Sequence, residues 1–254
     1  MYRVTALAES SGASWKVVVE VLERHRSIRR YKPRPIPEEH VEVLMRAAQR
    51  APTDATLHLW TAIRVRDKKL RRRIADLIGQ EHVFQAAEFF IFAADLYRMK
   101  RLLEYRGEKL GDVDYAYLLF AAIDAGIAAE NMAVVAEAMG YGTCYIGAVQ
   151  NAPGEIAELL SLPEKVYPLF GLTIGVPDED PPLRPRLPLH MLFHVDKYRD
   201  YKQEDLELAY SVMAPYSRYR DWLRVLKRYV TPGARLEQRS RLIPEVARRL
   251  GFKI

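Results

Sequence analysis

Two basic stretches far apart in the sequence contain residue types that bind anions. Residues 25–31 have the sequence HRSIRRY, and residues 184–188 have the sequence RPRLP. Side chains alternate between two faces of an extended segment, so His25, Ser27 and Arg29 are expected to project together, and so are Arg184 and Arg186. Guanidinium groups bind phosphate in planar, bidentate fashion. The pair of stretches predicts a phosphate site, although a chain with 39 Lys and Arg also forms such clusters on solvated surfaces by chance.

Length and composition limit the classes of protein that this chain can represent. Its 254 residues, 49% of them hydrophobic, suffice for one domain of ordinary upper size. The single cysteine, Cys144, excludes an internal disulfide and a four-cysteine zinc site, and the six histidines lack HExxH-like spacing. We therefore expect no structural metal, and we expect Cys144 to be a buried strand residue and not a catalytic thiol.

No signal peptide is apparent in the first ten residues, and no uninterrupted apolar run is long enough to span a bilayer. A cytoplasmic protein without a membrane partner is the expectation. The net charge is +6, and the densest basic run is residues 68–73. Leu70, Ile74, Leu77 and Ile78 give this run an apolar helical stripe, so its charges are expected on the outer face. A solvated helix face is favoured over a nucleic-acid site.

The hydrophobic patterns alternate between helices and strands, which predicts an α+β domain. Residues 113–139 form a long helical pattern that is apolar on nearly all sides, and such a helix must be covered by a large core or by a partner subunit. Beyond Pro188 the chain is helical and polar, as expected for arms that reach over a neighbour. Further helices are expected at 16–24, from Pro37 onward, at 68–78 and at 155–160, and strands at 61–65, 89–94, 144–147 and 169–176.

Gly140, Gly142 and Gly147 do not form a dinucleotide-binding fingerprint. The third glycine follows the second by five residues instead of three, and a helix precedes the motif instead of a strand. Gly140 and Gly142 are better explained as a helix end followed by a turn. Gly147 and Ala148 differ, because small residues at the end of a strand let a ligand approach the backbone closely.

The chain resembles the flavin reductase and oxygen-insensitive nitroreductase group of the nitroreductase superfamily, from about Val21 to about Tyr198. This resemblance implies a homodimer and a central mixed, mostly antiparallel sheet flanked by helices, with a long buried central helix. It implies one FMN-binding domain over residues 1–254, with a core at about 16–198 and a helical extension at 199–254 that packs on the partner subunit. The matching segments, in order, are HRSIRRY (25–31), RAPT (50–53), IRV (63–65), GQ (79–80), HV (82–83), QAAEF (85–89), YIG (145–147), LFGL (169–172) and RPRLP (184–188).

The same resemblance assigns the FMN-binding residues. Arg29 would lie by the pyrimidine end of the isoalloxazine, where a cation stabilises negative charge on N1 and O2 of the reduced ring, and Gln80 would hydrogen-bond the same end. Thr53 would replace a serine hydroxyl of the relatives. The phosphate and ribityl chain would lie near His25, Arg26, Ser27, Arg184 and Arg186, and the ring edge along Ile146, Gly147 and Ala148, the last of which is commonly glycine in relatives.

Residues 53–58 depart most from the family pattern. His58 stands in place of glutamine and Asp54 is an added carboxylate, and these changes either alter substrate preference or only affect packing. For the nucleotide, Arg218 and Arg220 are candidates to bind the 2′-phosphate of NADPH, with NADH as the other possible donor. Loss of either arginine should then raise KM for NADPH alone.

The implied reaction is a ping-pong hydride transfer from NADPH or NADH, through flavin N5, to nitroaromatics, quinones or free flavin. No side chain needs to act as a nucleophile, in agreement with the absence of a convincing Ser-His-Asp or Cys-His arrangement. Two alternatives stay open. One is a superfamily member that uses FMN in another redox role, such as dehalogenation or consumption of the flavin, and the other is a basic nucleic-acid-binding protein.

Overall fold

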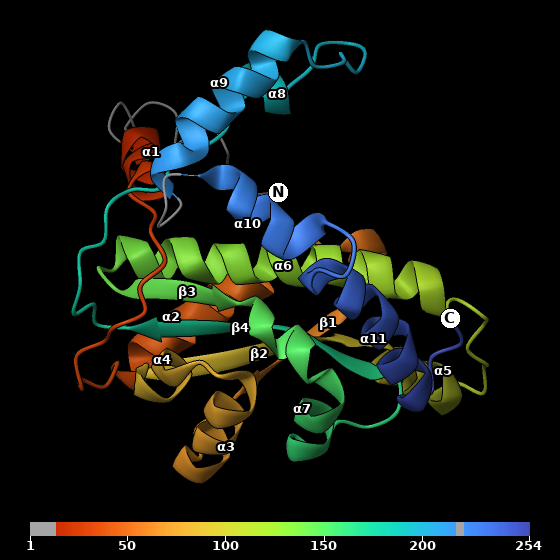
Figure 1. Cartoon of the computed structure of the whole chain (residues 1–254). Helices are drawn as coiled ribbons and strands as arrows, with labels where there is room; N and C mark the ends of the chain where they lie inside the picture. The colour runs from red at the N-terminus through yellow and green to blue at the C-terminus, as the bar shows by residue number, and fades with distance from the viewer. Residues whose placement is uncertain (1–13, 217–220) are drawn as a thin grey trace. The chain divides into compact units, whose positions relative to one another are not determined.

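The computed structural model describes residues 14–216 and 221–254. They divide into two units, the first ending at Pro181 and resuming at Ile243, and the second running from Pro182 to Leu242. The first unit contains the sheet and the helices that cover it (Figure 1).

The four-stranded sheet has the order β1-β2-β4-β3. The resemblance implied a mixed, mostly antiparallel sheet. Every pairing between the described strands is antiparallel, so this part of the chain has no parallel pair. All eight residues of β2 are buried, because this central strand is covered on both faces, and between Glu88 and Asp95 its six residues FFIFAA are accordingly apolar without alternation. The expected α+β class is confirmed. The strands are β1 (Trp60–Arg64), β2 (Glu88–Asp95), β3 (Gly142–Ile146) and β4 (Val166–Gly175).

Helices cover both faces of the sheet. On one face α2 and α6 pack against Phe90, Phe92, Leu172 and Ile174. On the other face α3, α4 and α7 pack against residues that include Phe89 and Ile146, and Figure 1 shows α6 and α3 with α7 on opposite sides of the strands. The elements of this unit are α1 (Ser14–Glu23), α2 (Glu38–Gln49), η2 (Asp54–Thr56), α3 (Lys68–Ile78), α4 (Glu81–Gln85), α5 (Leu96–Tyr105), α6 (Asp114–Ala138), η3 (Gly147–Asn151) and α7 (Pro153–Leu159).

Helix α6 is the long central helix that the sequence predicts, but one of its faces is exposed. One face of the helix carries buried alanines that allow close packing on α2 and β2, namely Ala121, Ala125, Ala128, Ala129, Ala133 and Ala136. By length and hydropathy alone α6 could cross a membrane. Its buried alanine face against α2 and β2 identifies it as the core helix of this unit, and Asp124 and Glu130 interrupt its apolar run. The opposite face exposes Tyr115, Leu119, Phe120, Ile123 and Ile127.

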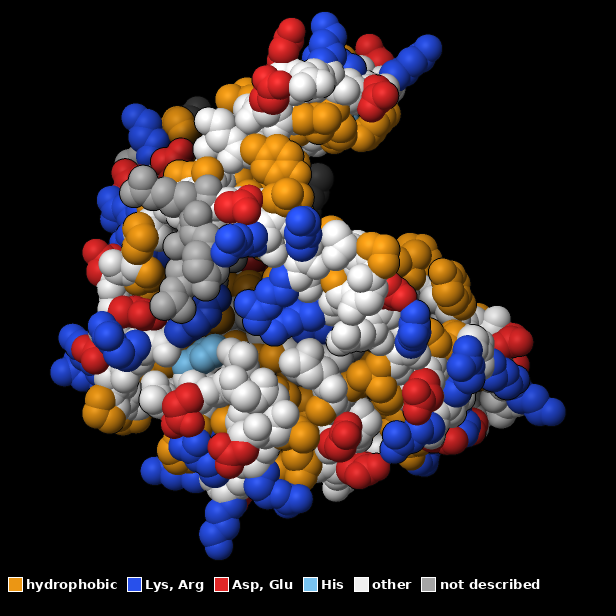
Figure 2. Space-filling view, in the orientation of Figure 1, with side chains coloured by type: hydrophobic (Ala, Val, Ile, Leu, Met, Phe, Trp, Pro, Cys, Tyr) orange, Lys and Arg blue, Asp and Glu red, His pale blue; other side chains and the backbone are white. Residues whose placement is uncertain are grey.

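The basic helix α3 differs in one respect from the expectation that its charges lie outside. Arg71 is only 7% exposed and donates hydrogen bonds to the carbonyls of Val65, Ala86 and Ala87. Arg71 lies on the same buried helix face as Ile74 and Ala75, which pack against the sheet. From this face its guanidinium reaches the carbonyl that follows β1 and the carbonyls between α4 and β2. Figure 2 shows acidic and basic side chains interspersed over the face that carries α3 and α7.

The second unit is helical. His194, Tyr198 and Tyr201 form an aromatic cluster in it, with the His194 and Tyr198 ring centroids 4.6 Å apart. Its last helix ends in the first unit, where Val246 and Phe252 are buried. Residues 243–254 therefore pack on the chain's own core. The helices are α8 (Leu189–Leu192), α9 (Gln203–Met213), η4 (Ala214–Tyr216), α10 (Trp222–Val230) and α11 (Arg235–Arg249).

Candidate functional site

The HRSIRRY segment lies beside the sheet and is held there by backbone and hydroxyl hydrogen bonds. The Ile28 amide donates to the Thr143 carbonyl of β3 at 2.8 Å, and the Lys32 amide donates to the Val176 carbonyl at 2.9 Å. The buried Tyr31 hydroxyl donates to the Ile28 carbonyl at 2.7 Å and lies 2.9 Å from Thr173 Oγ1. These contacts fix the residues that carry the predicted anion-binding side chains.

Two glycines of the sheet make room for this segment. A Cβ on Gly142 would lie 2.5 Å from Ile28 Cγ1, and a Cβ on Gly175 would lie 2.7 Å from Tyr31 Cδ1. Real Cβ atoms do not approach other atoms so closely, so both positions need glycine for close approach. Gly140 has a different role. It follows the end of α6 and has a φ of 83°, as expected for a glycine that terminates a helix.

His25 points to the C-terminal end of α6. Its Nδ1 lies 2.8 Å from Glu137 Oε1, an oxygen that also accepts a 2.5 Å hydrogen bond from Thr143 Oγ1. Arg29 is exposed and one of its guanidinium nitrogens lies 3.5 Å from the Ser27 carbonyl. Glu137 could not be predicted from the sequence as a partner of His25, because the two residues are far apart in the chain and meet only when α6 packs beside β3.

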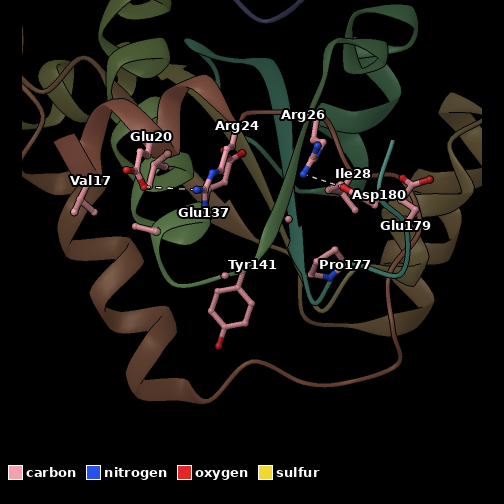
Figure 3. A pocket seen from close by; sticks show the side chains of 14 residues that line it. Val17, Glu20, Arg24, Arg26, Ile28, Glu137, Tyr141, Pro177, Glu179 and Asp180 are labelled. Carbon is pink, nitrogen blue, oxygen red and sulfur yellow. Dashed lines mark ion pairs between the residues drawn. The ribbon is translucent and has the colours of Figure 1, made fainter. Parts of the chain in front are cut away.

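A run of three acidic residues after β4 contacts the arginines of the HRSIRRY segment. Arg26 forms an ion pair with Asp180, with Nη2 and Oδ1 2.9 Å apart (Figure 3). The Glu179 carboxylate accepts the backbone N–H groups of Arg29 and Arg30. These acidic partners are not among the residues predicted from the sequence. Their only signal in the sequence is an acidic run, Asp178 to Asp180, shortly after the strand that ends near Tyr31.

Gln80 lies in the connection between α3 and α4, and His82 lies in the first turn of α4. Gly79 ends α3 in the left-handed region, with φ 64°, and Gln80 precedes α4 with its amide donating to the Ala75 carbonyl at 2.9 Å. His82 is 8% exposed, and within the described residues its Nε2 has no hydrogen-bond partner. Burial lowers the pKa of His82, and the positive charge of Arg29 lowers it further. Helix α4 thus places a neutral imidazole within the influence of Arg29.

The end of β3 borders open space. Ile146 is buried in the same apolar cluster as Val83 of α4, and Ala148 packs against that cluster. Gly147 is exposed, and a Cβ placed on it would meet no atom within 4 Å. Ala86, the residue after α4, also packs with Ile28 and Tyr31. Helix α4 therefore lies between residues 25–31 and residues 146–148.

The loop after Thr53 has a strained backbone. Ala55, Thr56 and His58 have φ values of 44°, 59° and 51°, a region that residues other than glycine rarely adopt. The buried Asp124 of α6 holds the loop, because its carboxylate accepts the Asp54 amide at 3.0 Å and the Leu59 amide at 3.4 Å. Thr53 is half-buried and His58 is exposed. These bonds attach the loop to α6 and not to the segments around α4.

The other predicted residues lie in or near the second unit. Arg184 and Arg186 are exposed in an irregular segment, where an Arg186 guanidinium nitrogen lies 3.2 Å from the Arg184 carbonyl and 3.3 Å from the Pro185 carbonyl. Their assembly with Arg26 into one phosphate site therefore stays a prediction. Arg218 and Arg220 lie outside the described residues.

The first unit has features that fit a planar, anionic ligand such as FMN. It supplies cations at Arg26 and Arg29, a buried His82 nitrogen to which no described residue hydrogen-bonds, and a backbone at Gly147 that faces open space. Guanidinium groups suit phosphate, and an exposed glycine directly after a strand lets a flat ring approach the backbone. The donor set thus agrees with the ligand that the sequence resemblance implies.

Known proteins resemble this chain over most of its length. Residues 22–176 match the model of the Nitroreductase family. An NADPH-dependent oxidoreductase of Staphylococcus aureus strain MRSA252 is 34% identical over 246 residues, which are 89% of this chain and 95% of the relative. Among solved structures, the NADPH:FMN oxidoreductase of Vibrio harveyi, complexed with NAD+, has a TM-score of 0.83 at 31% identity and covers 92% of this chain and 98% of its own. NfrA2 of B. megaterium has a TM-score of 0.86 at 31% identity, covering 94% and 98%.

Proposed function

Because the chain belongs to the Nitroreductase family, we propose that it is an FMN-dependent NAD(P)H oxidoreductase that reduces nitroaromatics, quinones or free flavin. The observation that carries this proposal is the arrangement around α4, where the charge of Arg29 acts on His82 and where the neighbouring Val83 packs with Ile146 at the end of β3. The relatives named NADPH-dependent oxidoreductase and NADPH:FMN oxidoreductase support the same activity.

FMN, when bound, supplies the site that accepts and donates hydride. The residues of this chain bind and orient it. His25, Arg26 and Ser27 would hold the phosphate and ribityl chain together with Arg184 and Arg186. Asp180 forms an ion pair with Arg26 and therefore lies where a ligand phosphate would bind this side chain.

The ring would be oriented by groups that the first unit holds rigidly. Arg29 provides a cation for the pyrimidine end, on a backbone fixed by Glu179. Gln80 would bind the same end of the ring, and Ile146, Gly147 and Ala148 would line its edge. Gly147 leaves room for this edge because its missing side chain would point into open space.

The loop from Thr53 to His58 is the proposed determinant of the oxidant. Its backbone strain is maintained by the Asp124 carboxylate, and strained segments cluster at functional sites. A loop held in this way presents the exposed His58 in a fixed position. Thr53 would contribute its hydroxyl to FMN.

We also propose that the functional form is a homodimer. The exposed face of α6 carries five large apolar residues within thirteen positions, from Tyr115 to Ile127. A contiguous exposed apolar surface of this kind marks a protein interaction site. A second copy of the same helix would cover it with a like surface, as in a two-fold interface.

The contacts of the basic residues in α3 argue against nucleic acid as a ligand, although the chain has a net positive charge. In the basic helix α3, Arg71 is buried and Arg72 pairs with Glu81 at 2.6 Å and with Asp76 at 3.3 Å. Two of the five cations in residues 68–73 are therefore engaged within the protein, which weakens the electrostatic footprint that nucleic-acid binding needs. We place the protein in the cytoplasm, where NADPH or NADH and small-molecule oxidants are its partners.

Purification and steady-state kinetics test the proposed function. The purified protein should be yellow, with close to one FMN per chain, and NADPH or NADH should bleach the flavin absorbance anaerobically. Nitroaromatics, quinones and free flavin should then accelerate nucleotide consumption with parallel-line, ping-pong kinetics. A colourless protein that binds no added FMN contradicts the proposal. If the nucleotide reduces the flavin but no oxidant accelerates nucleotide consumption, the alternative redox role is favoured.

Arg218→Ala and Arg220→Ala should raise KM for NADPH alone if these residues bind its 2′-phosphate.

A further inference from the structure

The acidic run Asp178 to Asp180 and the basic HRSIRRY segment form a paired surface in the first unit. Asp180 contacts the Arg26 guanidinium, Glu179 accepts two backbone N–H groups of the basic segment, and the Asp178 carbonyl accepts a 2.7 Å hydrogen bond from Arg30 Nε. Only the contact between Asp180 and Arg26 occupies a guanidinium that the proposed function assigns to the FMN phosphate. Figure 3 shows this ion pair at the pocket beside Ile28.

The environment of Arg26 is unfavourable for a further negative charge while Asp180 remains paired. The pocket has a volume of about 380 Å³. Its described lining contains four carboxylates, those of Glu20, Glu137, Glu179 and Asp180, but only two guanidiniums, those of Arg24 and Arg26. A phosphate that binds Arg26 must therefore either displace Asp180 or accept its repulsion.

Displacement is feasible because the two side chains are exposed to different extents. The Arg26 side chain is 32% exposed, whereas the Asp180 side chain is 81% exposed. Asp180 can swing into solvent with little loss of packing, while the position of Arg26 is set by the anchored segment. An exposed ion pair of this kind contributes little to stability but competes directly with a ligand anion.

We propose that Asp180 is an affinity-determining residue that competes with the FMN phosphate for Arg26 and so loosens the hold of the protein on its flavin. This inference rests on the proposed function, because it needs FMN as the ligand. Its consequence is faster exchange of FMN between protein and solution than the arginine alone would permit. Glu179 has a different part, since it holds the backbone of the basic segment and leaves the guanidinium of Arg26 free of its carboxylate.

Flavin titration of the apoprotein tests the proposal. FMN is added to the unliganded full-length protein and binding is followed by quenching of flavin fluorescence. Asp180→Asn should lower the Kd for FMN about two- to fivefold, the range of an exposed ion pair, and slow FMN release by a similar factor. Asp178→Asn is the matched control. It removes the same charge from the same run, but its carboxylate lies 3.8 Å from Arg30 Nε and not at Arg26.

Two further arms separate direct competition from a general charge effect. Riboflavin has no phosphate, so its Kd should be equal for Asp180→Asn and the unmodified protein. In an Arg26→Ala background, Asp180→Asn should no longer change the Kd for FMN, because the group under competition is absent. A non-additive double-mutant cycle is the expected signature.

The proposal is overturned if Asp180→Asn leaves the Kd unchanged or raises it, the second result meaning that Asp180 positions Arg26 for the phosphate. An equal gain for Asp178→Asn, or for riboflavin, also overturns it. In all these cases the unmodified protein still binds FMN, so the proposed function stands. Failure of every variant and of the unmodified protein to bind FMN would overturn both.

Discussion

Gly142 of β3 lies directly against Ile28 of the HRSIRRY segment, and a Cβ on Gly142 would come within 2.5 Å of Ile28 Cγ1. The Ile28 amide bonds to Thr143, the next residue of the same strand. The position of His25, Arg26 and Arg29 therefore depends on a strand residue that has no side chain. This relationship connects the packing of the sheet to the proposed capture of FMN.

Replacing Gly142 by alanine should displace the segment. Overpacking of a tight contact costs about 1 to 3 kcal/mol, so we expect Gly142→Ala to lower the unfolding free energy of the apoprotein by that amount and to raise the Kd for FMN. Urea denaturation and flavin titration measure the two effects. Gly147→Ala is the control for stability, because a Cβ there meets open space. Equal stability of Gly142→Ala and the unmodified protein would contradict the geometry.

Removing a phosphate-binding arginine should yield largely apoprotein. A hydrogen bond to a charged group contributes about 1.5 to 3 kcal/mol, so Arg26→Ala or Arg186→Ala should raise the Kd for FMN at least about tenfold and lower the melting temperature of the protein as purified. Arg46→Ala is the control, since Arg46 is exposed on α2 and does not line the pocket of Arg26. Full flavin occupancy in the Arg26 and Arg186 variants would refute the phosphate assignment.

Arg29 should tune the flavin and not merely retain it. If its cation stabilises negative charge at the pyrimidine end, Arg29→Ala should lower the two-electron midpoint potential by roughly 30 mV or more, which corresponds to about 1.4 kcal/mol. Arg29→Lys keeps the charge and should keep most of the potential. Dye equilibration under anaerobic conditions provides the measurement. An unchanged potential in the alanine variant would place Arg29 away from the ring.

His82 should make the fold sensitive to mild acid. Burial and the charge of Arg29 lower its pKa below the ordinary value of 6.5. The unfolded chain then binds a proton near pH 6.5 that the folded chain does not yet bind, so unfolding free energy falls as the pH drops below that value.

His82→Gln removes this titration and should lose less stability between about pH 7.5 and pH 5.5 than the unmodified protein. Urea denaturation at the two pH values checks the difference. His58→Gln, which replaces an exposed histidine, controls for loss of an imidazole. The same pH dependence in the His82 variant and the unmodified protein would argue against a buried neutral His82.

The exposed face of α6 should mediate dimerisation. Ile123→Glu places a charge in the middle of this apolar face and should shift the protein from dimer to monomer in sedimentation or light scattering, with loss of FMN if the site is composite. Leu102→Glu is the matched control, because Leu102 is an exposed apolar residue of α5. A monomeric unmodified protein, or a dimer that survives Ile123→Glu, would exclude this interface.

Most elements of the fold could be predicted because their signals are local. The fully apolar run of β2 indicated a buried central strand, and Gly140 marked the end of the long helix. The placement of Arg71 could not be predicted from its basic run. Its burial depends on the carbonyls of Val65, Ala86 and Ala87, which reach it only after β1, α3 and α4 have packed together.

The sequence by itself determined which residue types are available for an anionic flavin and on which segments they lie. The reason is that the residue types set the charge of each segment, and their order sets its local conformation. Only the tertiary structure decided how these residues are engaged. Arg26 is paired with Asp180, His25 lies against Glu137, and the amides of Asp54 and Leu59 are held by Asp124. Each of these contacts joins residues far apart in the chain. Their geometry depends on the packing of α6, β3 and β4, which no local spacing specifies.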